Sequence, residues 1–280
     1  MRRCLGLVIS AALLASLAAC SLASEGGSHR TGDQARQATT HRPTTVAKAH
    51  TGALTTRGAP GERTAAVAAP ATWDYVALGD SLAAGVGARE GYVERYAAHI
   101  ESDTGARVEV LNLGVSGQTS SELLYALRND ESMRRALRTA EVVTLNIGIN
   151  DLGHAGEAYE SGVCGGSDNQ GCLRAAVEKL EENWDAILAE ILRLRSTGNT
   201  VIRTAGLGYT PRVARVFEPY VARVDRHNAA TSAGHGIPYA QPYLDEGHMS
   251  PDGVHPNDEG YEVIAERLRE LGYAPLSSTR

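Results

Sequence analysis

Four short segments of the chain contain residue types that could perform nucleophilic catalysis on an acyl group. They are Gly-Asp-Ser-Leu at 79–82, Asn-Leu-Gly-Val-Ser-Gly-Gln-Thr at 112–119, Gly-Ile-Asn-Asp at 148–151 and Asp-Gly-Val-His-Pro-Asn at 252–257. A serine becomes a nucleophile when a histidine takes its proton, and backbone N–H groups or a side-chain amide can stabilise the resulting oxyanion. The first two segments could equally be turns that cap helices, and the third could be an Asx turn.

The fourth segment places an aspartate three residues before a histidine. The Asp252 carboxylate can reach Nδ1 of His255 within one loop, which fixes the tautomer and leaves Nε2 free to act as a base. A metal site that also uses His248 is the alternative, but His248, Asp252 and His255 lack a recognised ligand spacing. We therefore predict no metal and no cofactor.

Alternating strand and helix patterns surround these segments and predict an α/β domain. Apolar runs predict strands at 75–78, 107–113, 142–147, 200–205 and 237–240. Amphipathic patterns predict helices at 92–101, 120–139 with a break, 173–195, 213–233 and 259–271. Such alternation is typical of right-handed crossovers around a mainly parallel sheet, whose functional sites lie beyond the carboxyl ends of the strands. The first three segments stand directly after predicted strands.

Together the four segments resemble the SGNH hydrolases, also called the GDSL esterase/lipase family. The matching residues, in the order of the family, are Ser81, Gly117, Asn150 and His255. The resemblance extends from Trp73 to the last helix and implies a three-layer α/β/α sandwich around a five-stranded, mainly parallel sheet. It also implies a Ser81–His255–Asp252 triad, with an oxyanion hole formed by the N–H groups of Ser81 and Gly117 and the Asn150 amide.

These roles predict a serine esterase that hydrolyses carboxylic esters. A lipase, phospholipase or thioesterase on the same site is the first alternative, and a non-catalytic surface lipoprotein that binds acylated glycans is the second. We expect residues 152–172, which follow Asn150, to form a loop beside the site. This segment is rich in Gly, Asp and Glu and has one aromatic residue, Tyr159. A polar border of this kind favours short acyl or O-acetyl esters over long lipid chains.

Two cysteines, Cys164 and Cys172, lie in this Gly-rich segment. In an exported protein, two such thiols favour a disulfide that closes the loop. A pair of free thiols is the alternative.

The first 20 residues have the layout of an export signal. Two arginines precede an apolar stretch that ends in small residues, as in a secretory signal peptide. Residues 17–20, Leu-Ala-Ala-Cys, resemble the bacterial lipobox, which implies cleavage before Cys20 and attachment of a lipid anchor there. A plain signal peptide, with secretion, and an uncleaved anchor are the alternatives. We thus predict a signal peptide at 1–19, a lipidated tether at 20–70 and the hydrolase domain at 71–280.

Composition supports this division and excludes some partners. Residues 21–70 contain no aromatic residue, so they lack the apolar surface that would offset the entropy of ordering them. The leader and tether carry eight basic and three acidic residues, so the net charge of −6 for the chain leaves −11 for 71–280. An acidic domain of this kind argues against binding nucleic acid. Apart from the first 20 residues, no apolar run is long enough to span a membrane.

Overall fold

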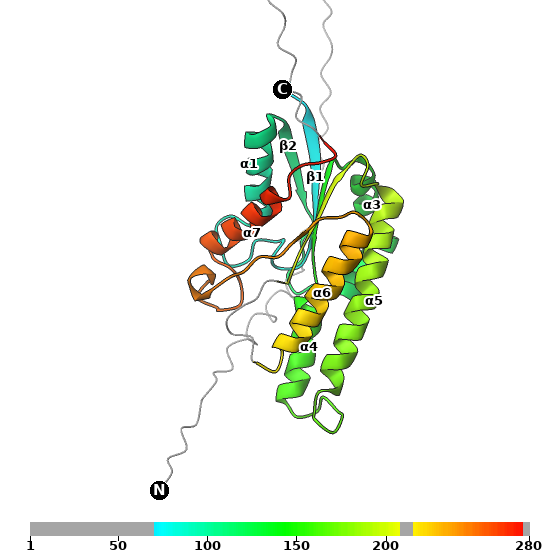
Figure 1. Cartoon of the computed structure of the whole chain (residues 1–280), viewed down its shortest axis with the longest axis vertical. Coiled ribbons are helices and arrows are strands. Elements are labelled where there is room, and N and C mark those ends of the chain that lie inside the picture. The colour runs from blue at the N-terminus through cyan, green and yellow to red at the C-terminus, as the bar shows by residue number, and fades with distance from the viewer. Residues whose placement is uncertain (1–69, 208–214, 277–280) are drawn as a thin grey trace, which may run out of the picture. The chain divides into compact units, whose positions relative to one another are not determined.

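The computed structural model describes residues 70–207 and 215–276, which form a three-layer α/β/α arrangement (Figure 1). The central sheet has five strands: β1 (Thr72–Gly79), β2 (Arg107–Asn112), β3 (Val142–Asn146), β4 (Val201–Ala205) and β5 (Tyr239–Ala240). The helices are α1 (Tyr92–Thr104), α2 (Ser120–Asn129), α3 (Glu131–Thr139), α4 (Ile149–Glu160), α5 (Gly171–Leu194), α6 (Glu218–Gly234) and α7 (Asp258–Glu270), with a short 3₁₀ helix at Glu246–His248.

The strand order is β2-β1-β3-β4-β5 and every neighbouring pair is parallel. The chain therefore moves to one side of β1 to form β2, and then to the other side to form β3. Gly79 at the end of β1 pairs with Asn146 at the end of β3. A reversal of this kind opens a crevice at the carboxyl ends of the two strands, where α/β proteins bind their ligands.

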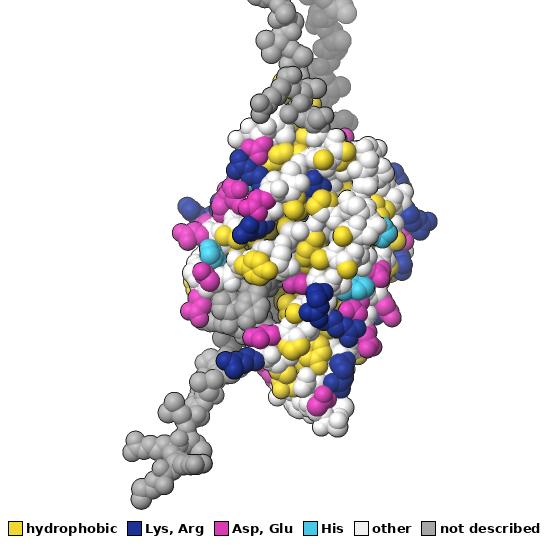
Figure 2. Space-filling model, viewed as in Figure 1, with side chains coloured by type: hydrophobic (Ala, Val, Ile, Leu, Met, Phe, Trp, Pro, Cys, Tyr) yellow, Lys and Arg dark blue, Asp and Glu magenta, His cyan; other side chains and the backbone are white. Residues whose placement is uncertain are grey.

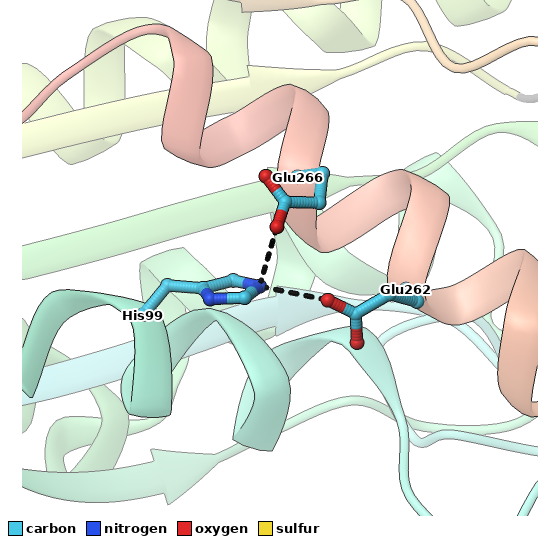
Figure 3. Close-up of side chains that lie close together, drawn as sticks. All are labelled: His99, Glu262 and Glu266. Atoms are coloured by element: carbon cyan, nitrogen blue, oxygen red, sulfur yellow. Dashed lines mark hydrogen bonds and ion pairs between the residues drawn. The ribbon is translucent and has the colours of Figure 1, made fainter. Parts of the chain in front are cut away.

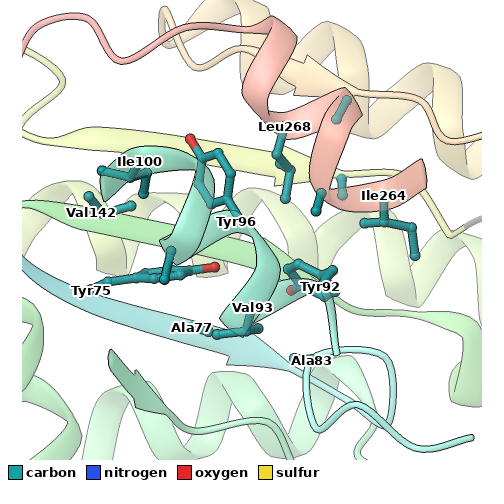
Figure 4. Close-up of a cluster of buried hydrophobic side chains, with 14 of the residues drawn as sticks. Tyr75, Ala77, Ala83, Tyr92, Val93, Tyr96, Ile100, Val142, Ile264 and Leu268 are labelled. Atoms are coloured by element: carbon teal, nitrogen blue, oxygen red, sulfur yellow. The ribbon is translucent and has the colours of Figure 1, made fainter. Parts of the chain in front are cut away.

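Strand β1 is buried on both faces because helices cover the sheet from both sides. Tyr75 and Ala77 point into a core shared with α1 and α7, which lie together on one side of the sheet (Figure 4). Val76 and Leu78 point into a second core that includes α2, α3 and α5. Successive side chains of a strand point to opposite faces, so a continuous apolar run fits a strand of this kind.

The predicted fold class, with its five strands in order, is confirmed. The break predicted within 120–139 falls at Asp130, which caps the start of α3 by accepting hydrogen bonds from the N–H groups of Ser132 and Met133. Helix α2 starts with a capping box, in which Thr119 and Glu122 each accept a hydrogen bond from the other's backbone N–H. The predicted helix 213–233 begins later, at Glu218.

The prediction that 152–172 is a loop was wrong in its first half. Residues Ile149–Glu160 form α4, and only the stretch between α4 and α5 is irregular. Leu152, Ala155 and Gly156 form the buried face of this helix. Two glycines within the helix lower its intrinsic propensity, and the buried stripe is short, which explains why the pattern was missed.

The predicted signal peptide, Cys20 and nearly all of the tether lie outside the described residues. Among the described helices, none combines the length and the apolar character required to cross a bilayer.

Candidate active site

Ser81 lies in a tight turn that follows β1 directly. The Ala84 N–H donates to the Asp80 carbonyl at 3.0 Å, and the Val86 N–H donates to the Ser81 carbonyl at 3.0 Å. From α7, the Tyr261 hydroxyl donates to the Val86 carbonyl at 2.7 Å. These bonds fix the backbone around Ser81. Ser81 itself is buried, with 5% of its surface exposed.

Asp80, the residue before Ser81, is a buried carboxyl group that is 1% exposed. Its Oδ1 accepts a hydrogen bond from the Leu82 N–H at 3.0 Å. Burial, with a smaller contribution from the nearby Asp151 carboxylate, raises the pKa of Asp80 to about 7 against the opposing effect of the backbone hydrogen bonds. Asp80 therefore changes its charge near neutral pH, inside the turn that presents Ser81.

Asp252 and His255 form a hydrogen-bonded pair in the loop before α7. His255 Nδ1 lies 2.7 Å from Asp252 Oδ2. Asp252 Oδ1 accepts hydrogen bonds from the N–H groups of Val254 and His255 at 2.8 and 2.9 Å, and from the Ser250 hydroxyl at 2.7 Å. Partial burial raises the pKa of Asp252, but the hydrogen bonds from His255, Val254 and Ser250 outweigh it and hold that pKa well below its usual range.

The ionised state of Asp252 decides the tautomer of His255. An ionised carboxylate can only accept, so Nδ1 must carry the proton that lies between the two residues. In neutral His255 the lone pair is then on Nε2, which is the atom that can take a proton from a serine.

Ser81 and His255 line the same pocket, whose volume is about 420 Å³ when its open mouth is included. The other lining residues come from the segments that follow the strands, from the loop before α7 and from α7 itself: Leu82, Ile149, Gly206, Leu207, Pro242, Leu244, Val254, Pro256 and Ile264. The wall is mostly aliphatic. The structure therefore places a serine and a histidine beside an apolar cavity, beyond the carboxyl ends of the parallel strands.

Gly87 shows how closely the segments of Ser81 and His255 approach each other. A Cβ atom built on Gly87 would lie 2.7 Å from the His255 Cβ and 2.8 Å from the Pro256 carbonyl oxygen. Gly87 also has a φ of +97°, a conformation that L side chains rarely adopt. Only glycine lets the turn after Ser81 contact the loop of His255 in this way, and sequence analysis did not single it out.

The 112–119 segment is hydrogen-bonded to the turn that contains Ser81. The Val115 N–H donates to the Gly79 carbonyl at 3.0 Å, and Asn112 Nδ2 donates to the Ala83 carbonyl at 2.7 Å. Further along, Gly117 has a φ of +80°, and a Cβ atom there would have no neighbour within 4 Å. Its backbone is therefore open to the approach of a ligand.

Asn150 lies in the first turn of α4, directly beyond β3. Its Nδ2 donates to the Gln118 carbonyl at 2.9 Å, which joins it to the segment of Gly117. Because an amide nitrogen carries two hydrogens, this bond orients the group and leaves one hydrogen for a ligand. The four segments predicted from sequence thus meet at the ends of β1, β2 and β3.

The Cys164–Cys172 disulfide closes the stretch between α4 and α5, with a Cα–Cα distance of 4.8 Å. The Cys172 N–H also donates to the Cys164 carbonyl at 2.7 Å. Within the described part of the chain, the pocket wall includes Ile149 but no residue from 152–172. The polarity of that segment therefore does not describe the wall of the pocket.

One histidine–carboxylate group among the described residues is compact enough to hold a metal ion, and it lies between α1 and α7 (Figure 3). His99 Nε2 is 3.0 Å from Glu262 Oε1 and 3.6 Å from Glu266 Oε1. Arg95 pairs with Glu262 at 2.8 Å and Arg269 pairs with Glu266 at 3.0 Å. Both carboxylates thus have cationic partners already, and the group is an ion network that joins the two helices.

Known proteins were compared with the chain and its structure. A lipase from a goat rumen metagenome has a TM-score of 0.62 at 27% identity, covering 72% of this chain and 98% of that one. The acetylxylan esterase Axe2 from Geobacillus stearothermophilus has a TM-score of 0.56 at 17% identity, covering 73% of this chain and 96% of that one. At this low identity, the similarity to Axe2 shows only that the two proteins share a fold.

Sequence comparison gives a consistent result. The spore germination lipase LipC of Bacillus licheniformis is 29% identical over 216 residues, which cover 73% of this chain and 99% of the relative. The model of the GDSL-like lipase/acylhydrolase family matches residues 77–263. That match extends from within β1 to within α7 and includes all four segments of the site. The chain therefore belongs to the GDSL-like lipase/acylhydrolase family of ester hydrolases.

Proposed function

We propose that the protein hydrolyses carboxylic esters with Ser81 as nucleophile, His255 as general base and Asp252 as the group that orients His255. The observation that carries the proposal is the 2.7 Å contact between Asp252 Oδ2 and His255 Nδ1, in a loop whose histidine lines one pocket with Ser81. In the structural relative Axe2, variants of a serine, of an aspartate and of a histidine three positions after it are described as catalytic mutants.

The chemistry proceeds in two halves. Ser81 Oγ attacks the ester carbonyl carbon while His255 Nε2 takes its proton, and Asp252 stabilises the imidazolium. The oxyanion of the tetrahedral intermediate is held by the N–H groups of Ser81 and Gly117 and by the Asn150 amide. The intermediate collapses, and the alcohol leaves with the proton from His255. Water activated by His255 then cleaves the acyl-Ser81 ester and releases the carboxylic acid.

The acyl group is the finer part of the proposal. We favour short acyl or O-acetyl esters because the chain has few aromatic residues, which commonly line the pockets of large apolar ligands. The aliphatic pocket wall supports the second candidate, a lipase with longer acyl groups, because a hydrocarbon chain gains about 0.8 kcal/mol for each CH₂ buried. A series of p-nitrophenyl esters separates the two candidates: a maximum at C2–C4 supports the first and a maximum at C8 or longer supports the second.

Covalent labelling with a fluorophosphonate probe tests the nucleophile. We expect the wild-type protein to be labelled on Ser81, and Ser81→Ala to lose both labelling and ester turnover. Thermal unfolding of the two proteins should nearly coincide because the substitution removes one hydroxyl. Ester turnover retained by a clean Ser81→Ala preparation would overturn the proposal, and an unlabelled wild-type protein would favour a non-catalytic binder of acylated glycans.

We further propose that the enzyme acts outside the cytoplasm, anchored by a lipid on Cys20. The lipobox-like residues 17–20 support this location, as does the Cys164–Cys172 disulfide, since disulfides persist in oxidising compartments. Expression of the full chain and of Cys20→Ala in a bacterial host tests the anchor. Wild-type protein should fractionate with membranes and incorporate labelled fatty acid, and Cys20→Ala should do neither. Equal incorporation in both would show that Cys20 is not the lipidated residue.

A further inference from the structure

The two turns that carry the predicted oxyanion-hole groups are joined by hydrogen bonds that the catalytic roles do not explain. The Ser120 N–H donates to Asp151 Oδ2 at 2.9 Å, and the Ser120 hydroxyl donates to Asp151 Oδ1 at 2.6 Å. Ser120 comes three residues after Gly117, and Asp151 comes directly after Asn150. We propose that Asp151 is a positioning residue that holds the Asn150 amide and the Gly117 N–H at the separation that the oxyanion requires. This inference rests on the proposed function.

The arrangement is more than a local helix cap. A carboxylate in the first turn of a helix usually serves that helix, but both oxygens of Asp151, in α4, bind Ser120, the first residue of α2. Ser120 N–H is one of the N–H groups at a helix start that have no partner within the helix. Asp151 thus accepts a hydrogen bond from this N–H at the start of α2, although Asp151 lies 31 residues further along the chain.

A second side chain, Asn183, also holds Ser120 in place. Asn183, in α5, donates from Nδ2 to the hydroxyls of Ser120 and Ser121, at 2.8 Å each. Ser120 is 0% exposed and Asn183 is 2% exposed, so the bond between them is shielded from water. A shielded bond of this kind resists displacement, because breaking it leaves a buried polar group without a partner.

The Asn150–Gln118 bond is the second link between the same two turns. With the Asp151–Ser120 bonds, it fixes residues 118 and 120 to residues 150 and 151. Two adjacent links prevent the turns from rotating against each other, which a single link would allow. The pKa of Asp151 is raised because burial outweighs the hydrogen bonds from Ser120, which favour the charged form.

Geometry of this kind matters because catalysis depends on small distances. Displacement of a catalytic group by about 1 Å can lower a rate about 100-fold. The bonds of Asp151 therefore act through Asn150 and Gly117, without contact with the substrate.

Asp151→Asn tests the role. The amide can still accept from the Ser120 N–H, but its NH₂ group faces the Ser120 hydroxyl, which must turn from donor to acceptor. The substitution also removes the charge of Asp151, so the two charge-assisted bonds are weakened. We expect kcat for a p-nitrophenyl ester to fall at least tenfold with KM within twofold of wild type. Asp130→Asn is the matched control: Asp130 accepts from the N–H and hydroxyl of Ser132 at the start of α3 and does not line the pocket. It should leave kcat unchanged.

A double-mutant cycle separates positioning from a merely structural role. Because Asp151 acts through Asn150 as well as Gly117, Asp151→Asn should lower kcat by a smaller factor in the Asn150→Ala background than in the wild-type protein. Losses that multiply, or a folded Asp151→Asn enzyme with wild-type kcat, would overturn the inference. Should Asp151→Asn fail to fold, Ser120→Ala is the alternative variant: it removes the hydroxyl bonds to Asp151 and Asn183 but keeps the bond from the Ser120 N–H to Asp151. Its kcat should fall about threefold or more. A wild-type kcat in Ser120→Ala would then contradict the inference.

The outcome is distinguishable from failure of the proposed function itself. Turnover that survives Ser81→Ala would contradict the nucleophile whatever Asp151 does. Turnover lost in Ser81→Ala but unchanged in Asp151→Asn would contradict only the positioning role.

Discussion

At the scale of single residues, the Asp252–His255 pair has a close counterpart a few positions earlier. Asp245 and His248 share the three-residue spacing, and His248 Nδ1 lies 2.9 Å from Asp245 Oδ1. Spacing alone therefore does not identify the triad. The difference is location, because His255 lines the pocket with Ser81 and His248 is absent from the described lining.

This counterpart supplies a control for Asp252→Asn. An amide at 252 would present NH₂ to Nδ1, so the imidazole proton would move to Nε2 and the base would be lost. We expect kcat to fall on the order of 10³- to 10⁴-fold, a magnitude known from other triads. Steady-state kinetics check this, with Asp245→Asn expected to stay within twofold of wild type. Similar losses in both variants would indicate a general disturbance of the loop.

Asp80 gives a prediction about stability and pH. Its pKa is raised by burial to about 7 in the folded protein, against 3.8 for the ordinary group. Between these values the folded state holds a proton that the unfolded state has lost, so stability falls as pH rises and levels off above about 7. The raised pKa corresponds to a loss on the order of 4 kcal/mol.

Asp80→Asn should remove this dependence, because the amide does not ionise. Chemical denaturation at pH 5 and pH 8 checks the sign: the stability of the variant relative to wild type should be greater at pH 8. Asp252 does not mask the effect, because its lowered pKa confines its contribution to more acidic solutions. A relative stability that is equal at both pH values would show that Asp80 ionises normally.

At the scale of elements, the approach of the Ser81 turn to the loop before α7 depends on Gly87. Gly87→Ala adds a Cβ against His255 and Pro256 and also strains a positive φ. Gly105→Ala is the matched control, since it has a φ of +73° with no neighbour within 4 Å of the added Cβ. We expect the strained backbone to cost about 1 kcal/mol of unfolding free energy in both variants. Gly87→Ala should lose more, because its Cβ must also displace His255 or Pro256. Only Gly87→Ala should lose turnover, by tenfold or more.

If both glycine variants keep full turnover, then His255 and Pro256 can move to accommodate a Cβ at position 87 without loss of activity. If both lose turnover in proportion to their stability, the effect is one of folding. Esterase kinetics and urea denaturation on the same preparations distinguish these results.

The elements show what the sequence could and could not predict. The central strands were predicted because a strand covered on both faces is a continuous apolar run, as in β3, where all five residues are buried. Helix α4 was missed partly because of Gly156, where a Cβ would lie 3.1 Å from the Phe217 ring. Gly156 makes room for a residue 61 positions away. A local sequence pattern cannot reveal a contact of this kind.

The same limit applies to the site. The residues proposed for the triad and oxyanion hole follow strands in a fixed order, so their types and order were readable from the sequence. The residues that hold them in place could not be predicted. Tyr261 donates a hydrogen bond to the Ser81 carbonyl from 180 residues away, and Asp151 binds Ser120 from 31 residues away. Contacts between distant segments exist only once the sheet has brought the strand ends together.

At the scale of the whole molecule, the predicted division at residue 71 has a physical basis in the first strand. The Ala71 carbonyl accepts a hydrogen bond from the Arg107 N–H at 2.8 Å, and pairing with β2 begins at Thr72. Figure 2 shows acidic and basic side chains interspersed on the face in view, a surface suited to a soluble fragment. A chain that starts at 71 keeps every described strand and helix.

We therefore predict that a 71–280 fragment and a 20–280 protein, which lacks only the predicted leader, have the same thermal unfolding midpoint and the same kcat/KM. A 75–280 fragment is the matched comparison, since it lacks only four more residues. It loses the pairing of Thr72 and Trp73 with β2, the burial of Trp73, and the 2.8 Å bond from the Asp74 N–H to Glu141. Loss of a buried Trp alone destabilises a protein by about 3–5 kcal/mol. Calorimetry should thus show a much lower midpoint for 75–280, and a 71–280 fragment that unfolds equally early would place the domain boundary upstream of residue 71.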